Sequence, residues 1–225
     1  MESINYQILK RSEKKLLGLF FDYFQHVIKM HETLNKLLCE ADVTKREKLI
    51  QAIYEMEDFS NKSEFKLINE SIWAISKNSP LTNHLRLTIT IIMCSRDLKR
   101  ICDYANNLTK FVKHYQHLDV SIFSKLVNLH KSVLNNLKQT FASLQDKEKP
   151  LTIQFENVTK ILTEFEQQYR VVLTEYYDKV KDEKLSDRIF LIDLILSVKH
   201  IERINDYCYN IIKAFLFVKN PEVFN

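Results

Sequence analysis

Two acidic residues near the end of the chain, Glu202 and Asp206, stand four positions apart. On a helix this spacing puts both carboxylates on one face. Two oxygen donors so placed can hold one divalent or trivalent cation, or bridge two. The same spacing also occurs on solvent-facing helices, so the pair alone does not decide between a metal site and an ordinary surface.

The residues around this pair occur twice in the chain. Residues 96–110, RDLKRICDYANNLTK, align with residues 199–213, KHIERINDYCYNIIK, at a constant offset of 103. Six of the fifteen aligned pairs are identical: Arg100 with Arg203, Ile101 with Ile204, Asp103 with Asp206, Tyr104 with Tyr207, Asn107 with Asn210, and Lys110 with Lys213. The repeat indicates two copies of a three-helix unit, which we assign to residues 1–116 and 117–225.

Other site chemistries lack the residues they need. A ferritin-like di-iron centre requires Glu three positions before His on a helix, and none of the seven His has Glu there. The motifs HExxH and GxSxG are absent, and none of the four Cys forms a CxxC pair. His114 and His117 form a short pair that fits either a metal site or a solvated loop edge. The absences favour a binding protein over an enzyme.

Composition restricts the fold that must position these residues. One Gly and three Pro in 225 residues are too few for the tight turns of sandwiches and barrels, or for Gly-rich phosphate loops. The net charge of +4 comes from 33 basic and 29 acidic residues interspersed along the chain, which is not the pattern of a nucleic-acid-binding arm. Apolar runs are too short for a transmembrane segment or a secretory signal. We therefore expect a soluble, cytosolic protein with no nucleic-acid partner.

Apolar residues recur at helical spacing along nearly the whole chain, most clearly from Val158 to Val180. Polar or Pro-containing breaks at residues 40–46, 78–80, 145–150 and 181–187, together with the division between the two repeats near residues 115–120, give about six long helices. Asp119, Ser121 and Ser186 are candidate helix N-caps.

Two positions conflict with this helical pattern. Residues 85–91 alternate like a β-strand, but no partner strand or turn accompanies them, so we predict helix there too. The single Gly, Gly18, lies inside the first helix, where Gly costs about 1 kcal/mol relative to Ala. A close contact with a neighbouring helix would explain it.

The duplicated helices resemble the PhoU family, the regulators of bacterial phosphate uptake. The family's signature helix carries ERIGD once in each half, and here ERIND occupies 202–206 and KRICD occupies 99–103. The loop at 78–80 followed by Leu85-Arg86-Leu87 resembles the family's proline loop and the start of its third helix. The stretch 165–169 resembles part of its fifth helix. The resemblance covers residues 10–218.

This resemblance implies an all-α fold of two tandem antiparallel three-helix bundles related by a pseudo-two-fold. It also implies a non-enzymatic cytoplasmic protein, peripheral to the membrane through its partner. Family members restrain the high-affinity phosphate ABC transporter on its cytoplasmic side, and a partner sensor histidine kinase where one exists. They bind iron or zinc on the face with the acidic motifs. The positions that match the family's ligands are Glu202, Asp206 and Glu166 in the second unit, and Asp103 and Glu64 in the first.

The sequence departs from the family pattern in the first unit. Lys99 stands where the family has an acid, so its ammonium group would take the place of a metal and pair with Asp103 or Asp97. Cys102 and Asn205 replace the signature Gly. We therefore expect metal in the second unit, and weaker binding or none in the first.

Two alternatives to a regulator of the ABC transporter stay open. One is a PhoU-like accessory protein of a non-ABC phosphate or ion transporter, and the other is a helical metal-binding protein. The sequence is also compatible with a homodimer, and it does not identify the metal.

Overall fold

The computed structural model describes residues 2–80, 82–115, 120–182 and 185–220. These residues form six helices: α1 (Glu2–Cys39), α2 (Val43–Asn78), α3 (Thr82–His114), α4 (Val120–Gln145), α5 (Leu151–Asp182) and α6 (Leu185–Lys219). The described residues contain no strand, and residues 85–91 lie inside α3 as predicted. None of the described helices has a stretch apolar and long enough to cross a membrane.

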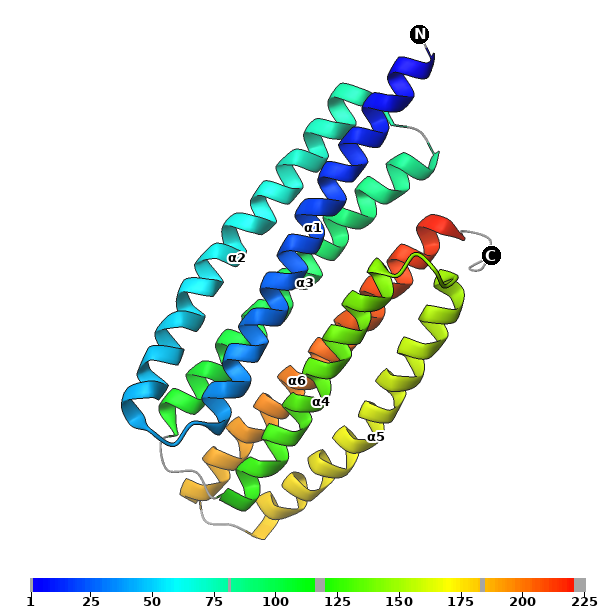
Figure 1. Cartoon of the computed structure of the whole chain (residues 1–225). Helices are drawn as coiled ribbons and strands as arrows, with labels where there is room; N and C mark the ends of the chain where they lie inside the picture. Colours follow the sequence, from blue (N-terminus) through cyan, green and yellow to red (C-terminus); the bar gives the residue numbers. More distant parts are fainter. Residues whose placement is uncertain (1, 81, 116–119, 183–184, 221–225) are drawn as a thin grey trace.

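The six helices form two antiparallel three-helix bundles that lie side by side (Figure 1). Helices α1, α2 and α3 pack on one another, and so do α4, α5 and α6. The bundles meet where α3 packs on α6 and α1 packs on α4, whereas within the described ranges α2 and α5 contact only helices of their own bundle. The predicted fold class is therefore confirmed. The predicted unit boundary, between residues 116 and 117, lies outside the described residues.

Local sequence accounts for the helix ends. Asp42 caps α2 by accepting a hydrogen bond from the backbone N–H of Lys45 at 2.9 Å. Ser79 ends α2 in the left-handed region, and its N–H donates to the carbonyl of Ile75 at 3.0 Å. Ser121 and Ser186 fall one residue inside α4 and α6, so neither holds the predicted N-cap position. Asp119 lies outside the described residues.

The apolar stripes that the sequence predicted face the core. Val158, Leu162, Phe165, Tyr169 and Tyr176 are buried along α5. Aromatic rings also join the two bundles into one core. Phe20 of α1 lies 5.1 Å from Phe215 of α6, and Phe24 lies 5.3 Å from Phe141 of α4, measured between ring centroids. The apolar area that these rings bury stabilises the association of the two bundles.

Gly18 has a different environment from the one expected. It is exposed on α1, and a Cβ atom added there would have no neighbour within 4 Å. A close helix contact therefore does not explain this Gly.

Two fully buried histidines, His31 of α1 and His130 of α4, meet at the junction of the bundles. The carbonyl of Ile101 can only accept, so Nε2 of His31, 3.1 Å away, carries the proton that it donates. Nδ1 of His31 is then the acceptor for Nε2–H of His130 at 3.2 Å. This leaves Nδ1 of His130 as an acceptor, 3.5 Å from the carboxamide of Asn35, whose NH₂ group satisfies it when turned to that nitrogen.

Burial favours the neutral form of both imidazoles in this hydrogen-bond chain. Burial lowers the pKa of His31 to about 4, although the bond to the Ile101 carbonyl partly offsets this effect. Burial also lowers the pKa of His130, and the neighbouring His31 lowers it further. Protonation of either ring would put an uncompensated charge between the bundles.

We predict that the free energy of unfolding decreases as the pH falls below about 6.5, the ordinary pKa of His in an unfolded chain. Below that pH the unfolded chain binds protons that the folded histidines do not, so each histidine costs up to about 1.4 kcal/mol per pH unit until its folded pKa is reached. Urea denaturation at pH 7, 6 and 5 measures the slope. The slope should become shallower in His130→Gln, and an unchanged slope would contradict the assignment.

Candidate functional site

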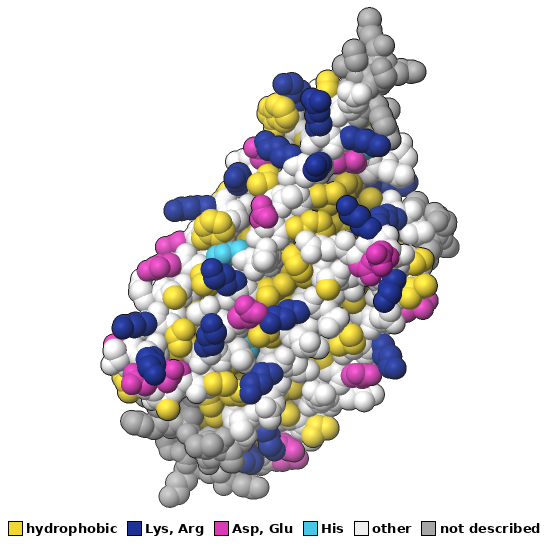
Figure 2. Space-filling model, viewed as in Figure 1, with side chains coloured by type: hydrophobic (Ala, Val, Ile, Leu, Met, Phe, Trp, Pro, Cys, Tyr) yellow, Lys and Arg dark blue, Asp and Glu magenta, His cyan; other side chains and the backbone are white. Residues whose placement is uncertain are grey.

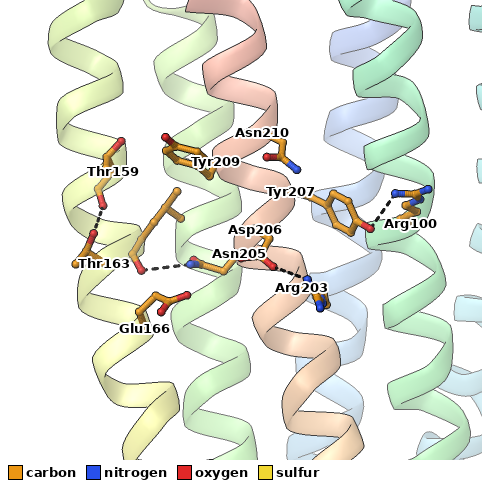
Figure 3. Close-up of a pocket in the computed structure, with 11 residues that line it drawn as sticks. Arg100, Thr159, Thr163, Glu166, Arg203, Asn205, Asp206, Tyr207, Tyr209 and Asn210 are labelled. Carbon is orange, nitrogen blue, oxygen red and sulfur yellow. Dashed lines mark hydrogen bonds and ion pairs between the residues drawn. The ribbon is translucent and has the colours of Figure 1, made fainter. Parts of the chain in front are cut away.

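The three acidic residues predicted in the second unit lie on two adjacent helices. Glu166 of α5 and Asp206 of α6 line a groove of about 510 Å³ between these helices (Figure 3). Glu202 is one helical turn before Asp206 and electrostatically coupled to both residues. The side chains of Thr159, Thr163 and Asn210 supply further polar groups to the groove.

Burial and mutual repulsion perturb these carboxylates. Partial burial raises the pKa of Glu202, and the charges of Asp206 and Glu166 raise it further, against the opposing effect of Arg203. The pKa of Asp206 is also raised, mainly by burial, and Arg203 partly offsets that shift. The raised pKa values of Glu202 and Asp206 favour a bound cation or proton beside them.

Each of the three carboxylates also has a partner within the protein. Arg203 donates to Asp206 at 3.2 Å, and Nη2 of Arg170 lies 3.6 Å from Oε2 of Glu166. Glu202 accepts from the hydroxyl of Tyr169, whose pKa is raised to about 12 by burial and by this carboxylate. No three His, Cys, Asp or Glu side chains of the described part of the chain converge closely enough to hold a metal ion.

The donor chemistry of this groove suits some metals better than others. The lining side chains offer carboxylate, hydroxyl and amide oxygens, and no thiol or imidazole. Oxygen donors fit hard cations such as Mg²⁺ or Mn²⁺, whereas zinc sites use Cys and His. The groove therefore fits a hard cation better than it fits zinc, and a cation there would displace Arg203 from Asp206.

In the first unit Lys99 lies among the acidic side chains. Its ammonium pairs with Asp103, which is the first of the two partners that the sequence suggested, and lies 3.7 Å from Oε1 of Glu57. Glu64 lies close to this group. Its pKa is raised mainly by burial and also by Asp103, and is lowered by Lys99 and Arg96. Asp103 and Glu64 are thus brought together as expected, around an internal cation.

Glu57 belongs to this cluster but was missed at the level of sequence. It precedes Glu64 by seven residues, which is two helical turns and places both on the α3-facing side of α2. Asn106 donates from Nδ2 to Glu57, while its buried Oδ1 has no partner. The spacing of the two Glu was visible in the sequence, but the resemblance pointed only to Glu64.

The two copies of the repeated motif touch each other between α3 and α6. Arg100 donates to the hydroxyl of Tyr207 at 3.2 Å, and the rings of Tyr104 and Tyr207 stack with centroids 6.1 Å apart. Arg203 bonds Asp206 in its own helix instead of the opposite Tyr104. His114 is exposed and packs edge-on against Tyr115, while His117 lies outside the described residues.

Comparisons with known proteins agree on one family. The PhoU domain profile matches residues 22–112 and again residues 126–215. The Mycoplasma genitalium protein MG409 is 75% identical over 225 residues, which is all of both chains. The Thermotoga maritima phosphate-specific transport system accessory protein PhoU homolog 1 is 21% identical over 210 residues, covering 92% of this chain and 88% of its own.

A solved structure has the same fold. The crystal structure of PhoU from Pseudomonas aeruginosa matches with a TM-score of 0.82 at 17% sequence identity, and the match covers 94% of this chain and 99% of that one. At this level of identity the structural likeness concerns the fold alone.

We predict that Lys99→Met lowers the free energy of unfolding by about 2 kcal/mol at neutral pH, because it leaves the carboxylates of Glu57, Glu64 and Asp103 facing one another without a cation. The loss should shrink near pH 4, where protonation removes the repulsion. Urea denaturation measures both effects. The exposed Lys36 provides the matched control, Lys36→Met, which should change stability by less than about 0.5 kcal/mol. Equal effects of the two substitutions would contradict the role of Lys99.

Proposed function

This chain belongs to the PhoU domain family, and from that premise we propose that it is an accessory regulator of phosphate transport. In this proposal it binds a phosphate ABC transporter on the cytoplasmic side and lowers its flux. The observation that carries the proposal is the double match to the PhoU domain, over 91 and 90 residues. The name of the Thermotoga maritima relative, which describes a phosphate-specific transport accessory protein, supports the same role.

The proposed regulator acts by binding and not by chemistry. The repeated motifs present charged and aromatic side chains along one face, including Arg100, Arg203 and Tyr207. Such a face suits recognition of another protein. The protein would be cytoplasmic and peripheral to the membrane through its partner. Where the cell has a sensor histidine kinase for phosphate, that kinase is a second proposed partner.

A second candidate role is metal binding, and it is favoured by the carboxylates of the second unit. We propose that Glu202, Asp206 and Glu166, which do not converge on a metal position in this structure, draw together around a hard cation that displaces Arg203 and Arg170. The first unit would bind no metal at the equivalent position, because Lys99 already supplies a positive charge beside Asp103. The cation would serve to hold α5 and α6 together across their groove.

We predict that deleting the gene raises phosphate accumulation in phosphate-replete cells, because the transporter loses its restraint. Uptake of radioactive phosphate by deletion and complemented strains measures the effect. Inactivating the ABC transporter in the deletion strain separates the alternatives. Uptake that stays elevated would point to a non-ABC transporter as the partner. Unchanged uptake after the deletion alone would contradict a role in phosphate transport.

We predict that Glu202→Gln combined with Asp206→Asn removes most bound metal while leaving helix content nearly unchanged, since both side chains are partly exposed and lie outside the apolar core. Lys99→Glu should raise the metal stoichiometry by restoring an acid in the first unit. Elemental analysis after preparation with Mg²⁺, Mn²⁺, iron or zinc measures both changes. Zinc alone at the site, or metal that persists in the double variant, would contradict this assignment of ligands.

A further inference from the structure

Two grooves lie at opposite ends of the junction between α3 and α6. The first has a volume of about 650 Å³ and lies between the N-terminal half of α3 and the C-terminal end of α6. Its lining includes Ile89, Met93, Asp97, Lys213 and Phe217. The second has a volume of about 400 Å³ and lies between the C-terminal half of α3 and the first half of α6. Its lining includes Lys110, His114, Asp193, Leu196 and His200.

The internal repeat relates these two grooves to each other. Residues 103 positions apart occupy matching places in the two grooves. Met93 in the first groove corresponds to Leu196 in the second, and Lys213 in the first corresponds to Lys110 in the second. Further pairs follow the same rule: Cys94 with Ser197, Asp97 with His200, and Asn107 with Asn210. Each groove thus consists of one half of α3 and the complementary half of α6, as a pseudo-two-fold axis requires.

Several pairs of positions related by the offset of 103 residues are exposed. Packing within the fold therefore does not explain why both members of such a pair carry the same kind of side chain. Met93 is 59% exposed and Leu196 is 49% exposed, yet both copies carry a large apolar side chain there. Lys110 and Lys213 are also exposed, and both copies carry a lysine. Contiguous exposed apolar surface with a polar rim is typical of an interaction site.

The surface between the grooves is continuous. The ring of Tyr104 stacks on His200 of the second groove at 5.1 Å and on Tyr207 at 6.1 Å, between centroids. Arg100 donates a hydrogen bond to Tyr207. Asn210 lines both the first groove and the groove of the candidate site, which also includes Asp206 and Tyr207. We call this surface, made of the two grooves and the residues between them, the dyad face.

Charge indicates what the dyad face accommodates. Arg100, Lys110, Arg203 and Lys213 are all exposed on it. Its acids interact with groups of the protein itself: Asp193 accepts from the hydroxyl of Tyr115 at 2.5 Å, Asp206 accepts from Arg203, and Asp97 interacts electrostatically with Arg100 and Arg96. The face seen in Figure 2 likewise carries both basic and acidic side chains across its area. A second copy of this chain would oppose like charges on the dyad face, whereas an acidic segment with apolar side chains would match it.

We propose that the dyad face is the docking surface for a two-fold-symmetric protein partner, which presents the same acidic and apolar segment twice, one copy to each groove. One molecule of this protein then binds one two-fold partner. The inference rests on the proposed function for the source of the partner, which is the cytoplasmic side of the phosphate transporter.

A photocrosslinking residue placed at Met93 and, separately, at its mate Leu196 tests the surface. The probe is the phosphate transporter purified in detergent from the same cells. Both positions should crosslink to the same type of cytoplasmic subunit, and native mass spectrometry should find one chain per transporter. The control position is Phe65 on α2, which is 66% exposed and lies off the dyad face. It should give no crosslink.

Charge reversal at the paired lysines tests the chemistry of the partner. Lys110→Glu and Lys213→Glu should each weaken binding to the purified transporter about tenfold, and the two together should weaken it further. Lys131→Glu on α4 makes the same charge change at an exposed position away from the dyad face and should leave the affinity unchanged. Circular dichroism and thermal melting confirm that the variants remain folded.

The outcomes separate this inference from the proposed function. If the wild type binds the transporter but the dyad-face variants bind equally well, the docking surface is wrong and the proposed function stands. If only one lysine of the pair matters, the two-fold match is wrong. If the wild type fails to bind at all, both proposals fail. If charge reversal dissociates a homodimer in sedimentation experiments, the occupant is a second copy of this chain.

Discussion

The packing of α3 against α6 is the contact on which the arrangement of both units depends. These two helices are the repeated ones, so each copy of the motif packs against the other. Small buried side chains of α3 such as Cys94, which lines a groove together with Asn210 and Ala214 of α6, leave room for close helix packing. The Arg100–Tyr207 bond and the Tyr104–Tyr207 stack then join the motifs at the surface. Since α3 and α6 also carry the acidic motifs, their packing directs one motif to α2 and the other to α5.

The junction between the bundles includes a polar element that makes it sensitive to protonation. His31 and His130 are both fully buried and hydrogen-bonded to each other, and burial lowers the pKa of both. A buried hydrogen-bond network of this kind is satisfied in one geometry, and other geometries cost free energy because they leave buried polar groups without partners. It therefore fixes how α1 meets α4, in a junction where apolar rings such as Phe20 and Phe215 would tolerate small shifts.

The two acidic clusters show how one substitution makes duplicated units different. Both contain carboxylates from two neighbouring helices. In the first, the ammonium of Lys99 is an internal cation fixed to the chain, and it neutralises Asp103 directly. In the second, Glu202 takes the equivalent position, and its carboxylate adds to the repulsion that Arg203 only partly offsets. Glu202 in the second unit thus stands where the first unit has the internal cation of Lys99.

The sequence by itself determined the helices, their number and the duplication, because helical periodicity and the fixed offset of 103 residues are properties of the chain alone. It also indicated Glu202 with Asp206, since one helical turn fixes their separation. Tertiary structure decided the rest. The places of Glu57 and Glu166, the neutral pair of His31 with His130, and the two related grooves all depend on which helices become neighbours. Helix periodicity sets which side of a helix a residue occupies, but only packing decides what it meets there.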